Sequence, residues 1–236
     1  MVTVCSSRTT RTSTPAPGAC FAAFVRASCT TRWTARPYAT TVGAGKSTTM
    51  RLILGLDRPT AGRAVINGKQ YGEHRYPMRE IGGLLGVTAV HPRRPRNHLL
   101  AMAASHRIPA SRVDEVLDAV GLTDVAGRLA GTYSLGMSQR LGIAGALLGD
   151  PHVLMLDEPV NGLDPDGVRW IHTFLREFAN QGRTVFVSSH LMSEMKQTAD
   201  RLVVFGRGRL IADAEIGAPS STRSRPDECA EPCVDL

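Results

Sequence analysis

The sequence has no apolar run long enough to cross a membrane. A membrane-spanning helix needs about 20 consecutive apolar residues, whereas the longest apolar stretches here, near 81–87 and 141–148, are interrupted by glycine. Aromatic residues are few, at 5%, but apolar residues of all kinds make up 42% of the 236 positions, enough for a buried core. We therefore expect a soluble chain with one globular domain.

Cysteine and acidic residues are each missing from a long part of the chain. No cysteine occurs between 30 and 228, so the sequence predicts no disulfide framework. No Asp or Glu occurs in 1–39, where five arginines contribute to the formal net charge of +7. The other basic residues form no stripe with interleaved aromatic residues, as nucleic-acid-binding surfaces do. We expect no nucleic-acid partner.

Three zones differ in composition. Residues 1–41 are rich in Thr, Arg, Ser and Ala and show neither strand alternation nor helical periodicity, which predicts an atypical, disordered segment. Residues 42–213 alternate apolar strands with amphipathic helices, as an α/β domain requires. Residues 214–236 are rich in Ser, Arg and Pro and then acidic, which predicts a disordered tail.

The middle zone contains two consecutive strand–helix steps, which predict a parallel sheet. A helical insert is expected at about 86–135, and a hairpin near the end of the zone. Asp164 is expected to cap the helix 165–180. The other expected helices are 47–56 and 138–148, and the expected strands are 63–66, 81–85, 153–156, 184–188, 201–205 and 209–212.

A glycine-rich loop opens the first helix with the sequence Gly43-Ala44-Gly45-Lys46-Ser47-Thr48. Small residues let backbone N–H groups surround phosphates at the positive end of a helix. We expect Lys46 to reach the β- and γ-phosphates, Ser47 to bind Mg²⁺ and Thr48 to add a phosphate contact. The usual pattern has one more glycine, five residues before Gly45, where this chain has Thr40.

An apolar strand at 152–158 ends in two carboxylates, Asp157 and Glu158. At the edge of a sheet beside a phosphate loop, Asp157 can hold Mg²⁺, and Glu158 can orient and deprotonate the attacking water. The alternative is a strand end with two solvated acids. The phosphate loop upstream favours the catalytic interpretation.

Three weaker motifs accompany these two. Ser134 and Gly136 lie directly before a helix and can form a second anion site. The segment 161–164 follows the strand with the two acids, and His190 ends the next strand at the same sheet edge. The order of the five motifs is more specific than any one of them.

Together these motifs resemble the ABC transporter ATPase family over about 42–213. The loop at 43–48 is similar to the Walker A motif and 152–158 to Walker B. The segment 133–137 is similar to the signature motif, 161–164 to the D-loop, and His190 to the switch histidine. The fold class that follows is a P-loop NTPase core of α/β type, with a parallel sheet and a helical insert.

The resemblance implies ATP and Mg²⁺ as cofactors, with Lys46, Glu158 and His190 in catalysis and Ser47 and Asp157 at the metal. It implies a transmembrane permease as partner, and a dimer with itself or with a second ATPase subunit. In that dimer, each ATP lies between one Walker A loop and the partner's Ser134 and Gly136. The expected location is cytoplasmic, at the inner face of the cell membrane. The signature variant Tyr-Ser-Leu-Gly-Met at 133–137 is similar to that of bacterial drug-export ATPases, which favours export.

Besides Thr40, the chain departs from the family pattern in two further places. Gly86 stands where the family has its Q-loop glutamine. Residues 1–41 offer neither the β-subdomain that precedes the phosphate loop nor an adenine-stacking aromatic residue, so this subdomain is expected to be missing or scrambled. Our interpretation is that the chain before Val42, and also after Asp213, is translated from a shifted reading frame; an organellar targeting peptide is the alternative.

Two other functions remain open at this point. One is a degenerate or truncated ABC domain with little or no ATPase activity. The other is a soluble ABC ATPase that acts on nucleic acid or ribosomes, although the sequence has neither coiled-coil heptads nor a second phosphate loop.

Overall fold

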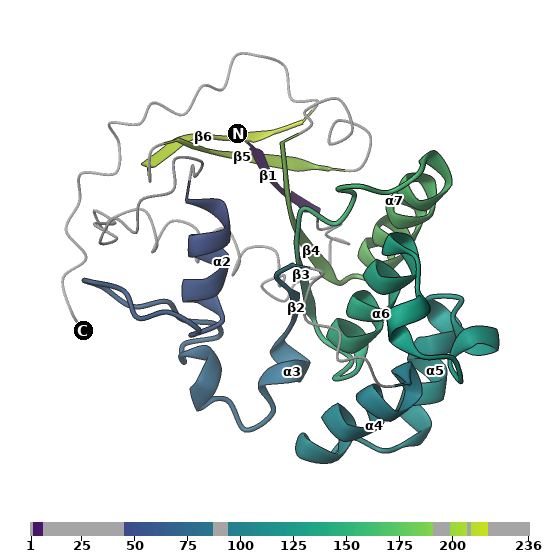
Figure 1. Ribbon diagram of the computed structural model, residues 1–236. Coiled ribbons are helices and arrows are strands. Elements are labelled where there is room, and N and C mark those ends of the chain that lie inside the picture. The colour runs from purple at the N-terminus through teal and green to yellow at the C-terminus, as the bar shows by residue number, and fades with distance from the viewer. Residues whose placement is uncertain (1, 7–44, 87–93, 191–198, 207–208, 217–236) are drawn as a thin grey trace.

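A single six-stranded sheet runs through the part of the chain that the computed structural model describes, residues 2–6, 45–86, 94–190, 199–206 and 209–216 (Figure 1). The strand order in the sheet is β2-β3-β4-β1-β5-β6. β2, β3 and β4 are parallel to one another, as the two strand–helix steps predict, and β5 and β6 form the expected antiparallel hairpin. The strands are β1 (Val2–Ser6), β2 (Ile81–Leu84), β3 (Val153–Asp157), β4 (Thr184–Ser189), β5 (Arg201–Gly206) and β6 (Arg209–Glu215).

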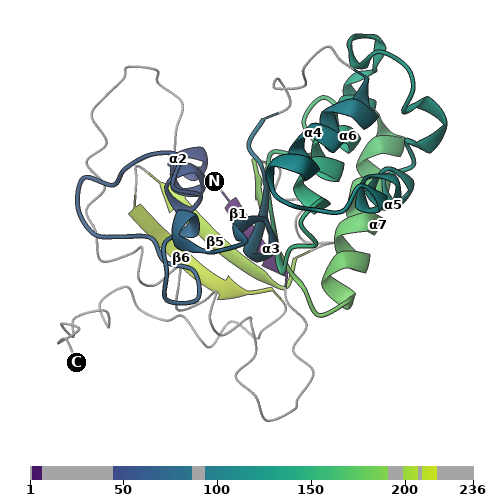
Figure 2. The same ribbon diagram turned by 90° about the horizontal axis from the view of Figure 1, so that it is seen from below.

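Helices cover both faces of this sheet. α4 to α7 gather on one face and α2 lies on the other, as the two views agree (Figures 1 and 2). In the described residues no helix combines the length and the apolar character needed to cross a membrane. The helices are α2 (Lys46–Ile53), α3 (Pro77–Glu80), α4 (Pro95–Ser105), α5 (Ser111–Ala119), α6 (Leu135–Leu147) and α7 (Pro165–Asn180), with short 3-10 turns at Tyr71–Glu73, Thr123–Val125 and Ala130–Thr132.

Alternation along the buried strands divides the apolar side chains between two cores. In β3, Leu154 and Leu156 belong to the larger core, which includes buried residues of α6 and α7. Met155, between them, belongs to a smaller core with Met50 and Ile53 of α2. Successive side chains of a strand point to opposite faces. A strand covered on both faces therefore has a nearly continuous apolar run, and such a run, at 153–156, predicted β3 in the sequence.

Helix α6 approaches β2 so closely that the position of Gly82 has no room for a side chain, and Gly142 of α6 faces Leu84 of β2. A Cβ atom on Gly82 would lie 1.9 Å from the carbonyl oxygen of Ala146, which real Cβ atoms do not tolerate. A Cβ atom on Gly142 would lie 2.7 Å from Leu84 Cδ1. The backbone contact fixes the position of α6 against the sheet, and with it the loop that precedes α6.

Capping and aromatic contacts fix α7 beside α6. The side chain of Asp164 accepts a hydrogen bond from the Gly167 N–H at 3.0 Å, so Asp164 caps α7 as predicted. The guanidinium of Arg140, on α6, lies 4.3 Å from the ring centre of Trp170, on α7. Such a cation–π contact adds to the apolar packing between the two helices.

The structure corrects three of the sequence predictions. Val2–Ser6, expected to be disordered, forms β1 and pairs antiparallel with β4 on one side and β5 on the other. β-Branched residues, which this segment contains, favour strands. Backbone pairing with a strand on each side stabilises β1 even though its sequence alternates only weakly.

The range 63–66 forms no strand and has only one isolated bridge, Ile66 to Lys69. β6 reaches Glu215, two residues into the predicted tail, because Glu215 pairs with Arg201. Residues 7–44 and 217–236 lie outside the described residues, so the other expectations for both ends stay predictions.

We predict that Gly82→Ala lowers the free energy of unfolding by about 1–3 kcal/mol or more, because the new methyl group meets backbone that cannot rotate away. Gly127→Ala is the matched control, since a Cβ atom there meets nothing within 4 Å, and its effect is expected to stay within about 0.5 kcal/mol. Urea unfolding measures the free energy of unfolding of both variants. Equal effects of the two changes would contradict the close contact between β2 and α6.

Candidate functional site

The first turn of α2 presents Lys46 and Ser47 toward the end of β3. Gly45 is the N-cap of α2 and has φ 92°, a left-handed conformation that glycine adopts without strain. The Lys46 side chain is only 6% exposed, whereas Ser47 and Thr48 are exposed. The first N–H groups of a helix have no partner within it, so this turn can bind an anion. Gly43 and Ala44, the first two residues of the predicted loop, lie outside the described residues.

The two acids follow each other at the end of β3. Asp157 is the last residue of β3, and Glu158 has φ 49°. A non-glycine residue in this left-handed region costs about 1–3 kcal/mol and persists only where surrounding contacts hold it. Here the Glu158 N–H donates to the carbonyl oxygen of Ser188 at 3.2 Å and to its hydroxyl oxygen at 3.0 Å. The neighbouring strand β4 therefore supports the turn that carries Glu158.

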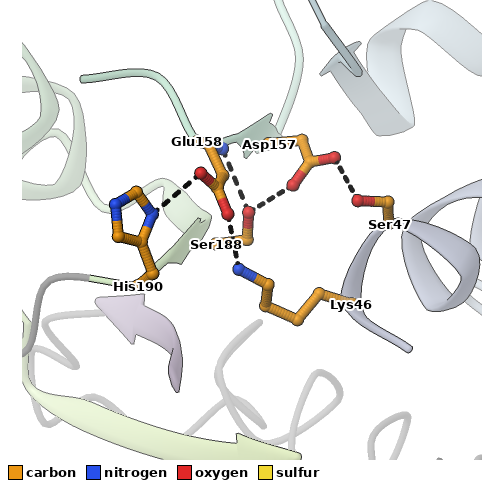
Figure 3. A network of polar contacts seen from close by, with 6 residues as sticks. All are labelled: Lys46, Ser47, Asp157, Glu158, Ser188 and His190. Atoms are coloured by element: carbon orange, nitrogen blue, oxygen red, sulfur yellow. Dashed lines mark hydrogen bonds and ion pairs between the residues drawn. The ribbon is translucent and has the colours of Figure 1, made fainter. Parts of the chain in front are cut away.

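Hydrogen bonds join α2, β3 and the end of β4 into one network (Figure 3). Lys46 Nζ lies 2.7 Å from Glu158 Oε1, and Ser47 Oγ donates to Asp157 Oδ2 at 2.5 Å. His190 Nδ1 lies 2.9 Å from the second Glu158 oxygen, Oε2. All five predicted catalytic and metal residues thus lie in direct hydrogen-bond contact with at least one other of the set. What they do there stays a proposal.

The charges around Glu158 set its protonation. Burial alone would raise the pKa of the Glu158 carboxyl, but the hydrogen bonds and charges of Lys46 and His190 outweigh burial and lower that pKa below its ordinary value. The side chain is 28% exposed, so the ion pair is only partly screened by water. Glu158 is therefore an anion near neutral pH, as a group that accepts a proton from water must be.

The donor set fits a magnesium ion and a phosphate group. Ser47 and Asp157 place a hydroxyl and a carboxylate oxygen side by side, and magnesium prefers such oxygen ligands, with phosphates and water completing its shell. The Lys46 ammonium and the N-terminus of α2 offer positive charge to phosphate. In this structure the ammonium is paired with Glu158. An ammonium has three N–H donors, so a phosphate that binds there can share or replace the carboxylate as the partner of Lys46.

Two other predicted ligands, Ser134 and Gly136, do not belong to this network. Ser134 is the N-cap of α6, and its hydroxyl accepts from the Met137 N–H at 3.2 Å. A Cβ atom on Gly136 would lie 3.6 Å from Leu163 Cδ2, so the start of α6 packs near the segment 161–164. α6 begins one turn earlier than predicted because Ser134 caps it.

The structure adds Ser188 to the residues that the motifs identify. Its hydroxyl donates to Asp157 Oδ1, and in the parallel ladder Ser188 is the register partner of Asp157. The signal was present in the sequence, since two parallel strands that end at one edge place their last residues side by side. Gly86, which replaces the expected Q-loop glutamine, has φ 101° and lies just after β2.

Comparisons with known proteins agree with this geometry. A family model described as "ABC transporter" matches residues 41–161. The bacitracin transport ATP-binding protein BcrA of Bacillus licheniformis is 40% identical over 175 residues, which cover 72% of this chain and 57% of that protein. The lantibiotic transport ATP-binding protein SrtF of Streptococcus pyogenes is 33% identical over 174 residues, which cover 73% of this chain and 75% of that protein.

A solved structure described as the ATP binding subunit of an ABC transporter superposes with a TM-score of 0.66 at 25% identity. The superposition covers 74% of this chain and 75% of that chain. The two sequence matches cover different shares of the relatives. The chain spans little more than half of the length of the bacitracin relative and three quarters of the length of the lantibiotic relative. The fold class is thus the predicted P-loop α/β type with a parallel sheet.

We predict that Glu158→Gln lowers the free energy of unfolding near neutral pH by about 1–3 kcal/mol, because it leaves the nearly buried Lys46 ammonium without a charged partner. Because the folded-state pKa of Glu158 is lowered, its stabilising contribution is complete above the ordinary value of 4.5 and is lost as the pH falls through the lowered pKa. The difference between the two proteins therefore narrows below pH 4.5.

Urea unfolding at a series of pH values checks this expectation. Glu177→Gln, on the exposed face of α7, is the matched control. A difference between Glu158→Gln and the unaltered chain that stays constant from neutral pH into the acid range would show that Lys46 and His190 do not stabilise the charged carboxylate.

Proposed function

Since the chain belongs to the ABC transporter family, we propose that it is the ATP-binding and ATP-hydrolysing subunit of an export system, which couples hydrolysis of Mg-ATP to transport through a separate membrane permease. One observation carries this proposal: three segments far apart in the sequence bring Lys46, Ser47, Asp157, Glu158 and His190 into one hydrogen-bonded network. A strand end with two solvated acids, the alternative considered for Asp157 and Glu158, does not account for that network.

Different residues of the site act on the phosphates, the metal ion and the attacking water. Lys46 and the backbone at the start of α2 bind the phosphates, and Ser47 and Asp157 hold Mg²⁺. A Mg²⁺ ion held by these two residues would supply positive charge to the phosphates. As Lys46 exchanges Glu158 Oε1 for phosphate, that oxygen becomes free to accept a proton from the attacking water. His190 meanwhile holds Oε2 and keeps the carboxylate in position.

Export rests on two kinds of support. The relatives named for bacitracin and lantibiotic transport share 40% and 33% of the aligned residues with this chain. The signature variant at 133–137 points the same way. We propose that a membrane permease binds this subunit at the cytoplasmic face of the cell membrane, and that the transported compound is of the drug or antibiotic type.

The remaining parts of the proposal concern assembly and boundaries. We assign Ser134 and Gly136 to the nucleotide of a second ATPase subunit, in a dimer of this chain with itself or with a related chain. The position of both residues outside the Lys46 network is consistent with this assignment, since they are then needed on the partner's site. The ATPase domain is assigned to 42–213, with the helical insert at 86–135 containing α4 and α5.

We predict that the chain hydrolyses ATP in the presence of Mg²⁺ and that Glu158→Gln lowers kcat by about 10²–10⁴-fold, the usual contribution of a general base. ATP binding is expected to survive, because Lys46 and Ser47 remain. Steady-state phosphate release and binding of a fluorescent ATP analogue measure the two effects, and Glu177→Gln serves again as the control. Identical low rates for the unaltered chain and Glu158→Gln would refute turnover and favour a degenerate domain.

A further inference from the structure

Ser188 is a buried hydroxyl between the two acids of the site. It lies in β4, is 0% exposed, and is the register partner of Asp157 in the neighbouring strand. It precedes His190 by two residues, and its sequence context alone assigns it no role. Figure 3 shows its hydroxyl directed between Asp157 and the backbone of Glu158.

The hydroxyl fixes the carboxylate of Asp157 from the side away from α2. A serine hydroxyl has one proton to donate and two lone pairs to accept with. The proton of Ser188 goes to Asp157 Oδ1. The other oxygen, Oδ2, is left facing Ser47 Oγ at 2.5 Å. The carboxylate is therefore held at one oxygen and presents the other to the place where the metal is proposed to bind.

The same hydroxyl also supports the strained backbone of Glu158. Its oxygen accepts the Glu158 N–H at 3.0 Å, and the Ser188 carbonyl oxygen lies 3.2 Å from the same N–H. Glu158 has φ 49°, a conformation that persists only where its surroundings hold it. The turn directs the Glu158 side chain to Lys46 and His190.

We propose that Ser188 is a positioning residue for the hydrolysis of Mg-ATP: its one hydroxyl sets Asp157 for the metal and Glu158 for the water at the same time. The inference rests on the proposed function. Alanine at this position leaves a carboxylate oxygen and an N–H group with one partner fewer in a buried place, where lost hydrogen bonds are costly. Loss of a group that orients a metal ligand commonly costs about 10–100-fold in metal affinity or activity.

A purely structural role for Ser188 is the competing explanation, and its neighbour supplies the control. Ser189 is equally buried, at 1% exposed, but its side chain points to the opposite face of the sheet. Ser189→Ala thus removes the same atom from the same strand on the face of the sheet away from Asp157. Ser188→Thr keeps the hydroxyl at the original position and tests for rescue.

The experiment compares Ser188→Ala, Ser188→Thr and Ser189→Ala in the full chain. Three quantities are measured: kcat, the affinity for a fluorescent ATP analogue with Mg²⁺ and with EDTA, and the exchange rate of the Glu158 amide proton by NMR. For Ser188→Ala we expect kcat and the gain in affinity from Mg²⁺ each to fall about 10–100-fold. The affinity in EDTA is expected to stay unchanged, and Glu158 amide exchange to become faster at equal global stability. Ser188→Thr is expected to restore most of the loss.

Two results would overturn the inference. The first is that Ser188→Ala changes kcat and the gain in affinity from Mg²⁺ no more than Ser189→Ala does. The second is an unchanged exchange rate of the Glu158 amide. If the unaltered chain neither binds nor hydrolyses ATP, the proposed function fails, but amide exchange still decides whether Ser188 holds the turn at Glu158.

Discussion

The parallel register between β3 and β4 is the constraint on which the site depends. It places Asp157 opposite Ser188, so that the residues following each strand emerge at one edge of the sheet. The smaller core then brings α2 to that edge, because Met50 packs with Met155 and Phe186 of the two strands. Packing of apolar side chains on one face of the sheet thus sets the distance between polar groups at its end. A shift of one residue in the register would send every side chain of β4 to the wrong face.

The polar groups of the site are hydrogen-bonded to one another. Lys46 is almost fully buried, and a buried ammonium without a partner would be costly. Glu158 supplies that partner, and His190 binds the second oxygen of the same carboxylate. The arrangement stabilises the folded chain and holds the Lys46 ammonium beside the carboxylate of Glu158, so a phosphate group that binds Lys46 also acts on the position of that carboxylate.

Sequence reasoning recovered what depends on local pattern. The cap at Asp164, the buried strands β3 and β4 and the C-terminal hairpin follow from periodicity and turn chemistry, and the order of the motifs predicted which polar residues meet. It missed Ser188, since a serine within an apolar strand acquires a role only from the register with its neighbour. It missed β1, because five residues are too few for a clear alternation and their partners lie near the other end of the sequence. Long-range pairing of this kind is not written in any single stretch of sequence.

β1 also determines when the sheet can form. It lies between β4 and β5 and pairs with both, so in the described residues it is the strand that joins β2, β3 and β4 to β5 and β6. Val2 pairs with Ser189 and with Val204, so these contacts join residues that lie far apart in the sequence. Closing so long a loop carries a large entropic cost and slows folding. During synthesis β1 is made long before β4 and β5, so these two pairings form only after both later strands have been made.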